Sequence, residues 1–361
     1  MLFQNFYVNK LKMLHWLLIV SISLVSFSIL MFFAAYFAIF DEAMAFYGVQ
    51  ERWKIVMMSN IFNIGYLALT PVLFSVIKPY YIPIVLTATL TTAIGCVGRY
   101  LTAPDYTSAL VFSALVGISQ VPIITAPYGL LGLFSKEVQG YASSIPLFVP
   151  VLGIDISILY GLVYISGIDP KSPELATSID SLHFITATVS IVAALLTFGC
   201  FYILKEQIED SQRNNEEEDS SQNCVSRILS QFSQGKQFFI LVLSWGLLLG
   251  VNWTYGSMFQ IIFMYTGLES KGRALIGLCA NLSSALFSNV GTFLANHSQY
   301  SRYQIILTLN LFGVGSSLFI FLTSLVDTPF LHGLGISIIA VVILRAGFTS
   351  FTALALLELK K

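Results

Sequence analysis

Two ionisable residues, Asp155 and Arg345, stand inside long apolar stretches of the sequence. Within a membrane such a charge is costly unless it faces protein or water, so it is a candidate functional group by default. We predict that Asp155 and Arg345 pair across a helical bundle and help to hold one of its faces closed. The alternative is that Asp155 caps a helix interrupted by Pro146 and Pro150, while the long stem of Arg345 carries its charge to the membrane surface.

Aromatic rings could form a binding site of another kind. Trp253, Tyr255, Phe259 and Tyr128 are candidates for a cage around a quaternary ammonium group, because each ring face attracts a cation by about 0.5–2 kcal/mol. The alternative is that these rings pack or anchor the chain at the membrane surface, since 14% of all residues are aromatic. The residue types fit both interpretations.

Neutral amides inside apolar stretches are the third group of candidates. Gln120, Asn252 and Gln260 either hydrogen-bond between helices or contact a ligand. The residues predicted to bind a substrate are therefore Trp253, Tyr255, Gln120, Tyr128 and Asn252.

The residues that usually carry enzymatic or metal chemistry are scattered. Four cysteines and four histidines lie far apart, without the spacing of a metal site or a disulfide framework. No Ser/His/Asp set and no paired carboxylates fall on neighbouring apolar segments. We therefore expect no enzymatic activity, no cofactor, no metal and no nucleic-acid partner.

The candidate residues must be positioned by helices that cross a membrane. The chain has 361 residues, of which 56% are hydrophobic and 10% charged, and its mean hydropathy is +0.79. A spanning helix needs about 20 mainly apolar residues. Ten segments meet that length, at approximately 14–40, 53–78, 81–100, 107–134, 139–166, 181–204, 237–265, 273–295, 303–325 and 330–357. The sequence thus predicts an all-α polytopic membrane protein.

A polar, acid-rich stretch divides these spans into two sets. Residues 205–236 form the only long loop, so we predict a six-helix half over 1–204, a cytosolic linker, and a four-helix half over 237–361. Basic residues in the short loops favour a cytosolic side for the linker and both termini. Two sets of spans around such a linker are typical of the major facilitator superfamily, whose halves have six helices each. The second half would lack two helices, and we expect a monomer in the lipid bilayer.

Several short motifs resemble one branch of that superfamily, the feline leukaemia virus subgroup C receptor-related transporters. The clearest is Ser-Trp-Gly-Leu-Leu-Leu-Gly over Ser244–Gly250, which continues through Asn252–Gln260. Other matching stretches are Ala45–Val49 with Trp53, Gly95–Leu101, Gly117–Pro122 with Pro127, Lys136–Val138, Gly272–Leu278 and Gly347–Leu359.

The resemblance implies a facilitator-type carrier for choline, ethanolamine or haem, with Trp253 as the counterpart of an aromatic site residue. The chain departs from that family at Phe148–Val151, where an Asn-Gln pair would face the substrate. It departs from the superfamily at Ser75–Pro79, where the acidic residue of the loop between helices two and three is missing. We expect a secondary transporter that moves a small organic solute by alternating access. The alternative is a sensor or accessory subunit of the same fold that no longer transports.

Overall fold

The computed structural model describes residues 2–76 and 80–217. It also describes a few residues between 271 and 282, namely 271, 272, 274, 275, 277, 278 and 282. Every element in this part of the chain is a helix. Six are long: α1 (Leu2–Ala34), α3 (Arg52–Val76), α4 (Tyr81–Thr102), α5 (Tyr106–Gly129), α6 (Lys136–Tyr160) and α7 (Pro173–Glu217). Three are short: α2 (Phe40–Phe46), the 3-10 turn η1 (Leu131–Leu133) and the π turn η2 (Gly161–Ile165).

Each of the six long helices overlaps one of the first six predicted spans, and the all-helical class is confirmed. Hydropathy located them because each needs an apolar surface along its whole length to lie in lipid. The helix α7 continues through Glu217, so the beginning of the predicted 205–236 linker is helical. The later spans lie outside the described residues, apart from a few helical residues within 273–295.

The prolines do not interrupt the helices. Pro122 and Pro127 lie inside α5, and Pro146 and Pro150 lie inside α6. Helices in membranes tolerate proline because neighbouring helices and side chains can satisfy the freed backbone groups. Asp155 therefore lies within a continuous helix, and the alternative in which it caps an interrupted helix is wrong.

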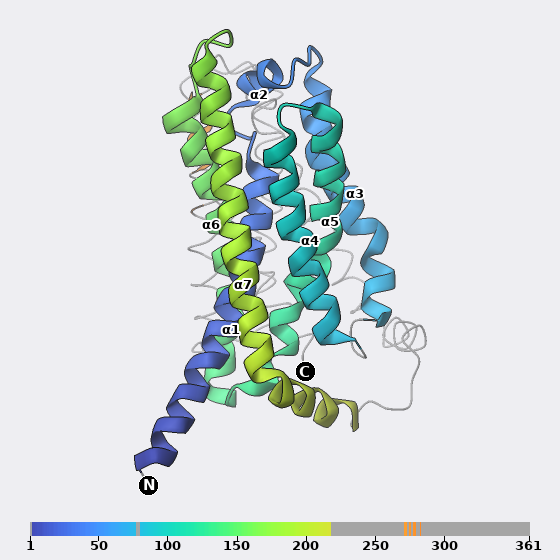
Figure 1. Cartoon of the computed structure of the whole chain (residues 1–361), viewed down its shortest axis with the longest axis vertical. Helices are drawn as coiled ribbons and strands as arrows, with labels where there is room; N and C mark the ends of the chain where they lie inside the picture. Colours follow the sequence, from blue (N-terminus) through green and yellow to red (C-terminus); the bar gives the residue numbers. More distant parts are fainter. Residues whose placement is uncertain are drawn as a thin grey trace, which may run out of the picture.

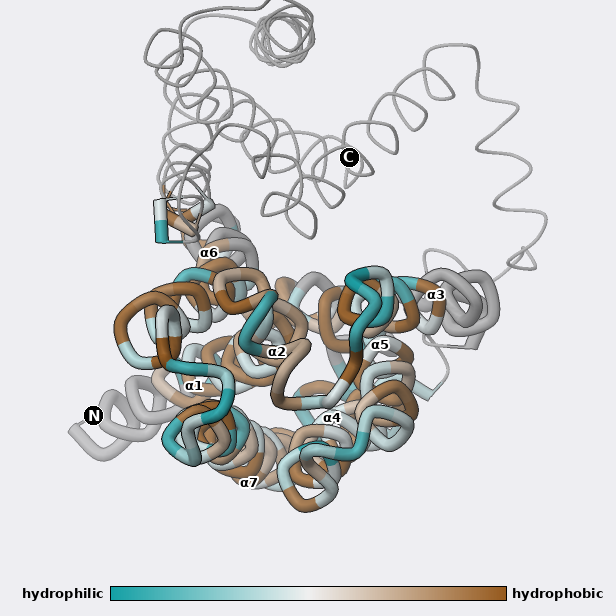
Figure 2. The backbone as a smooth tube through the Cα atoms, turned by 90° about the horizontal axis from the view of Figure 1, so that it is seen from above, coloured by the Kyte–Doolittle hydropathy of each residue, from teal (hydrophilic) through white to brown (hydrophobic). Residues whose placement is uncertain are grey.

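The long helices run side by side as a bundle, and the short helix α2 lies at the end opposite the amino terminus (Figure 1). Viewed along the bundle, α2 lies inside the ring that the long helices form (Figure 2). The helix α1 packs mainly against α6 and α7, α3 packs against α5, and α4 packs against α5 and α7.

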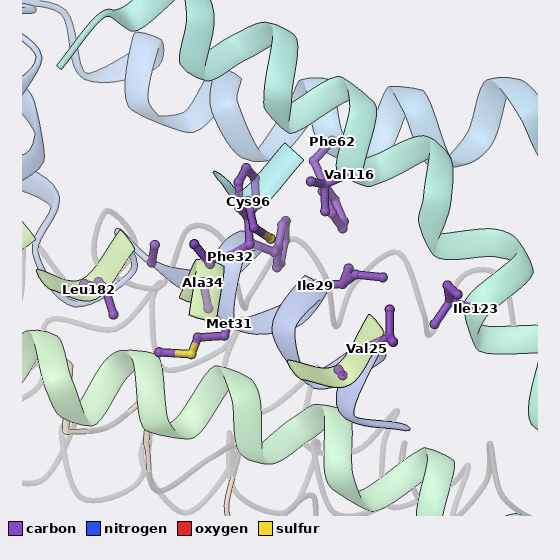
Figure 3. Packing of buried hydrophobic residues seen from close by; sticks show 14 of the residues in the cluster. Val25, Ile29, Met31, Phe32, Ala34, Phe62, Cys96, Val116, Ile123 and Leu182 are labelled. Atoms are coloured by element: carbon purple, nitrogen blue, oxygen red, sulfur yellow. The ribbon is translucent and has the colours of Figure 1, made fainter. Parts of the chain in front are cut away.

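Small residues allow the closest of these contacts. A Cβ atom on Gly117 of α5 would overlap the backbone of Phe62 in α3, and one on Gly153 of α6 would overlap the carbonyl of Phe27 in α1. Side chains from several helices fill the remaining interior (Figure 3), including Val25 and Ile29 of α1, Cys96 of α4, Val116 and Ile123 of α5 and Leu182 of α7.

The outer surface of the bundle is apolar. Leu90 and Ile94 of α4 and Leu195 and Tyr202 of α7 are all at least half exposed. Such a surface is unfavourable in water and suits lipid. Among the described residues, five helical segments are long and apolar enough to cross a membrane: Lys12–Ala34, Tyr81–Thr102, Tyr106–Leu133, Phe148–Ile165 and Pro173–Asp210. The chain is an integral membrane protein that crosses the bilayer several times.

Candidate functional site

Gln120 is the predicted substrate-binding residue that the structure describes in most detail. It lies in α5 with 1% of its surface exposed, and neither atom of its amide has a hydrogen-bond partner among the described residues. The preceding residue, Ser119, is by contrast bonded to Thr92 of α4 at 2.7 Å. A buried amide without a partner costs about 1–3 kcal/mol, so its presence needs an explanation. A polar ligand would supply the missing hydrogen bonds.

The other predicted residues are placed less completely. Asp155 lies inside α6 with 4% of its surface exposed. Tyr128 lies in the last turn of α5, and its side chain is outside the described set. Trp253, Tyr255, Asn252 and Arg345 lie outside the described residues. The pairing of Asp155 with Arg345 and the aromatic cage therefore stay predictions.

A buried arginine that the sequence analysis did not single out forms a second candidate site. Arg99 lies in the last turn of α4 with 3% of its surface exposed. Its Nη1 donates a hydrogen bond to the carbonyl of Phe32 at 3.0 Å, and its guanidinium lies 4.1 Å from the Phe32 ring and 4.5 Å from the Tyr36 ring. Among the described residues, no carboxylate lies within salt-bridge distance of Arg99.

The carbonyl that Arg99 contacts belongs to the end of a helix. Phe32 lies in the last turn of α1, where backbone carbonyls have no partner within the helix and carry the negative end of its dipole. The guanidinium is thus stabilised by a helix end and two aromatic faces. These groups are neutral, so they compensate the burial of its charge less completely than an ion pair would.

The second hydrogen bond of Arg99 reaches α7. Its Nη2 lies 3.3 Å from Nε2 of His183, which is also buried, and the Tyr36 hydroxyl lies 2.8 Å from the same nitrogen. The Tyr36 hydroxyl is also hydrogen-bonded to the hydroxyl of Tyr47, directly after α2. We call Arg99, His183, Tyr36 and Tyr47 the arginine cluster. It connects the end of α1 and the end of α2 to α4 and α7.

The helix α2 is held at the same end of the bundle by a second buried group. Oε1 of Glu42 accepts a hydrogen bond from the backbone N–H of Gly167 at 3.0 Å, in the connection between α6 and α7. Gly167 has a positive φ of 87°, which favours glycine at this position. Glu42 is 7% exposed. Two buried polar contacts thus hold α2, one from Glu42 to Gly167 and one from Tyr47, directly after the helix, to Tyr36.

Sequence reasoning missed the arginine cluster for a simple reason. Arg99 stands at the end of a predicted span, where a basic residue ordinarily reaches the membrane surface. Its partners come from residues 36, 47 and 183, which only the packing of the helices brings together. The available signal was a charged residue just inside the boundary of an apolar segment.

No family profile matches the chain, and no curated protein matches it. Solved structures do match. The proton:xylose symporter XylE, solved with 6-bromo-6-deoxy-D-glucose, has a TM-score of 0.69 and 11% identity over 96% of this chain and 82% of that one. The chain has the major facilitator fold.

Two further solved structures share that fold. The Escherichia coli fucose:proton symporter FucP has a TM-score of 0.62 and 14% identity over 97% of this chain and 83% of that one. The nucleoside transporter NupG has a TM-score of 0.58 and 15% identity over 94% of this chain and 82% of that one. The major facilitator fold agrees with the expectation from the span pattern. The narrower resemblance to the feline leukaemia virus receptor-related transporters finds no counterpart among these structures.

Proposed function

We propose that the chain is a secondary transporter that moves a small organic solute across a membrane by alternating access. The observation that supports this most strongly is the major facilitator fold, which the chain shares with solved symporters for fucose and xylose and with a nucleoside transporter. Proteins of this fold rock two half-bundles around a site near the middle of the membrane. Among the described residues, Gln120 of α5 offers such a site a buried amide that has no hydrogen-bond partner.

The proposed site combines Gln120 with Tyr128, Asn252, Trp253 and Tyr255. The amides would bind hydroxyl or carbonyl groups of the solute, and the aromatic rings would suit a cationic group. The family resemblance favours choline, ethanolamine or haem, whereas the solved structures of the same fold bind or carry sugars and nucleosides. All of these classes belong in the first screen.

We also propose that Asp155 and Arg345 pair and close one face of the transporter. A buried ion pair is favourable only while both partners are present, because a single buried charge costs about 3–5 kcal/mol. Each single replacement by alanine should therefore abolish transport. Exchanging the two charges should restore it, and failure of the exchange would remove the pair from the mechanism.

Ligand-induced stabilisation tests the site directly. The purified protein is heated in detergent with choline, ethanolamine, haem, fucose, xylose or nucleosides. A solute at 100 times its dissociation constant should stabilise the protein by about 2.7 kcal/mol. Gln120→Leu should lose that stabilisation while the ligand-free protein becomes no less stable, because an unsatisfied amide is removed.

The matched control is Gln207→Leu. Oε1 of Gln207 is already hydrogen-bonded to Nε2 of His15 at 2.9 Å. Replacing Gln207 should therefore leave the response to the solute unchanged. If Gln120→Leu responds to the solute as the unaltered protein does, Gln120 is not part of the site. If no solute of the panel stabilises the folded protein, the non-transporting sensor or accessory subunit becomes the better explanation.

A further inference from the structure

The arginine cluster restricts where His183 can hold a proton. An arginine side chain only donates hydrogen bonds and keeps its charge, so a nitrogen that it contacts must act as the acceptor. Arg99 Nη2 lies 3.3 Å from Nε2 of His183, which means that Nε2 carries no hydrogen. His183 is therefore neutral, with its proton on Nδ1, and Nδ1 has no hydrogen-bond partner among the described residues.

We propose that His183 is a proton-binding site, and that binding of the proton at Nε2 releases Arg99 and with it the end of α1. A proton on Nε2 removes the lone pair that accepts from Arg99, and the guanidinium cannot accept a hydrogen bond in return. Two positive charges at this distance in a poorly solvated interior repel each other strongly. The hydrogen bond between Tyr36 and Nε2 can persist, because the Tyr36 hydroxyl oxygen can accept the new Nε2–H.

The release of Arg99 would affect the end of α1 first. Its Nη1 leaves the carbonyl of Phe32, which then has no partner in a buried position. The residues that follow, from Ala35 to Ile39, lead directly into α2. The hydrogen bond from Arg99 to Nε2 and the protonated form of His183 thus exclude each other. Acid therefore shifts the population toward a state in which this end of the bundle is looser.

Other titratable groups surround His183 from each neighbouring element. Asp180 lies one turn before His183 on α7 and is half-buried. The remaining groups are Tyr36 after α1, Glu42 of α2, which is engaged at Gly167, Tyr47 after α2, Arg99 and Cys96 of α4, and Tyr106 of α5, whose ring packs against Tyr47. Tyr47 and Tyr36 form a hydrogen-bonded path that leads to Nε2.

The use of this proton in coupled transport rests on the proposed function, whereas proton binding itself does not. Two solved structures of the same fold are symporters that carry protons. If this chain transports, a proton at His183 would favour one of the two alternating states. The experiments that follow use no transported solute, so they remain informative even if the chain carries none.

Nitrogen-15 NMR of histidine-labelled protein tests the first step without any substitution. At neutral pH we expect one histidine with a protonated Nδ1 and an unprotonated Nε2, and that signal should change to the doubly protonated form in acid. Signals that show only Nε2–H tautomers at neutral pH would overturn the proposal.

Hydrogen exchange tests the second step. After correction for intrinsic rates, exchange of the backbone amides of residues 34–49 should rise at least about tenfold between pH 8 and the lowest pH at which the protein stays folded, because a charge-assisted contact is lost. In His183→Gln the rise should stay below about twofold, because the glutamine oxygen can still accept from Arg99 but binds no proton. The control His15→Gln, which removes a histidine bonded to Gln207 outside the cluster, should behave as the unaltered protein does. Equal pH dependence in His183→Gln and the unaltered protein would overturn the proposal.

Discussion

Replacing Gly153 by alanine should separate α1 from α6. A Cβ atom at this position would overlap the carbonyl oxygen of Phe27 and would stand 3.2 Å from the backbone nitrogen of Met31. Both neighbours are helix backbone and cannot rotate away, so the two helices must move apart. The change is small in volume but lies at the principal contact of α1 in the described part of the chain.

A second helical glycine provides the matched control. Gly199 lies in α7, and a Cβ atom added there would meet nothing within 4 Å. Alanine in place of a helical glycine gains about 1 kcal/mol through backbone propensity, and both variants share this gain. Overpacking costs about 1–3 kcal/mol, and only Gly153→Ala is overpacked. We therefore expect Gly153→Ala to be less stable than Gly199→Ala by about 1–3 kcal/mol, since the shared gain cancels.

Unfolding of the purified protein in mixed micelles, followed by the loss of helical circular dichroism, measures this difference. The pair is informative because each variant adds the same methyl group to a helix of the same bundle. If Gly153→Ala is as stable as Gly199→Ala, then α1 and α6 do not approach each other as the structure places them.

Two further predictions concern helix ends. Tyr81→Phe removes the hydroxyl that donates to the carbonyl of Ala126 at 2.5 Å near the end of α5, and should lower the free energy of unfolding by about 1–3 kcal/mol in a denaturant titration. Asp105 accepts hydrogen bonds from the hydroxyl and the backbone N–H of Ser108 at the start of α5, and these bonds hold the pKa of its carboxyl below the ordinary value. Because that pKa is lowered by folding, the stabilisation is complete above the unfolded-state pKa of about 3.9 and is lost as pH falls through the lower folded-state pKa. Asp105→Ala should therefore melt at a lower temperature than the unaltered protein at pH 7 and at nearly the same temperature at the lowest pH that the protein tolerates; an equal deficit at both pH values would contradict the capping role.

The long helices could be predicted from the sequence because lipid imposes a length and a composition on each of them. The predicted span 81–100 differs from α4 by two residues at its end. The span predicted over 14–40 fits less well, since α1 begins at Leu2 and ends at Ala34, and α2 follows at Phe40. Hydropathy measures the preference for an apolar environment, and it does not distinguish a spanning helix from a short helix buried at the end of a bundle.

The candidate site could be predicted only in part. Gln120 could be chosen as a candidate because a neutral amide in an apolar helix is conspicuous without knowledge of its neighbours, and its role in binding stays a prediction. Arg99 and His183 are 84 residues apart, and their hydrogen bond depends on how α4 packs on α7. Pairing of this kind has no local signature in a sequence. The alternative in which Pro146 and Pro150 interrupt the helix around Asp155 failed for the opposite reason, because a local rule for soluble helices was overridden by the surrounding bundle.

Uptake into proteoliposomes tests the proposed transport function most directly. Vesicles that contain the full chain are compared with empty vesicles for labelled choline, ethanolamine, fucose, xylose and a nucleoside, with and without a proton gradient. We predict saturable uptake of at least one of these solutes, and loss of that uptake in Gln120→Leu but not in Gln207→Leu. Correctly inserted protein that carries none of them, or uptake that Gln120→Leu leaves intact, would contradict the account.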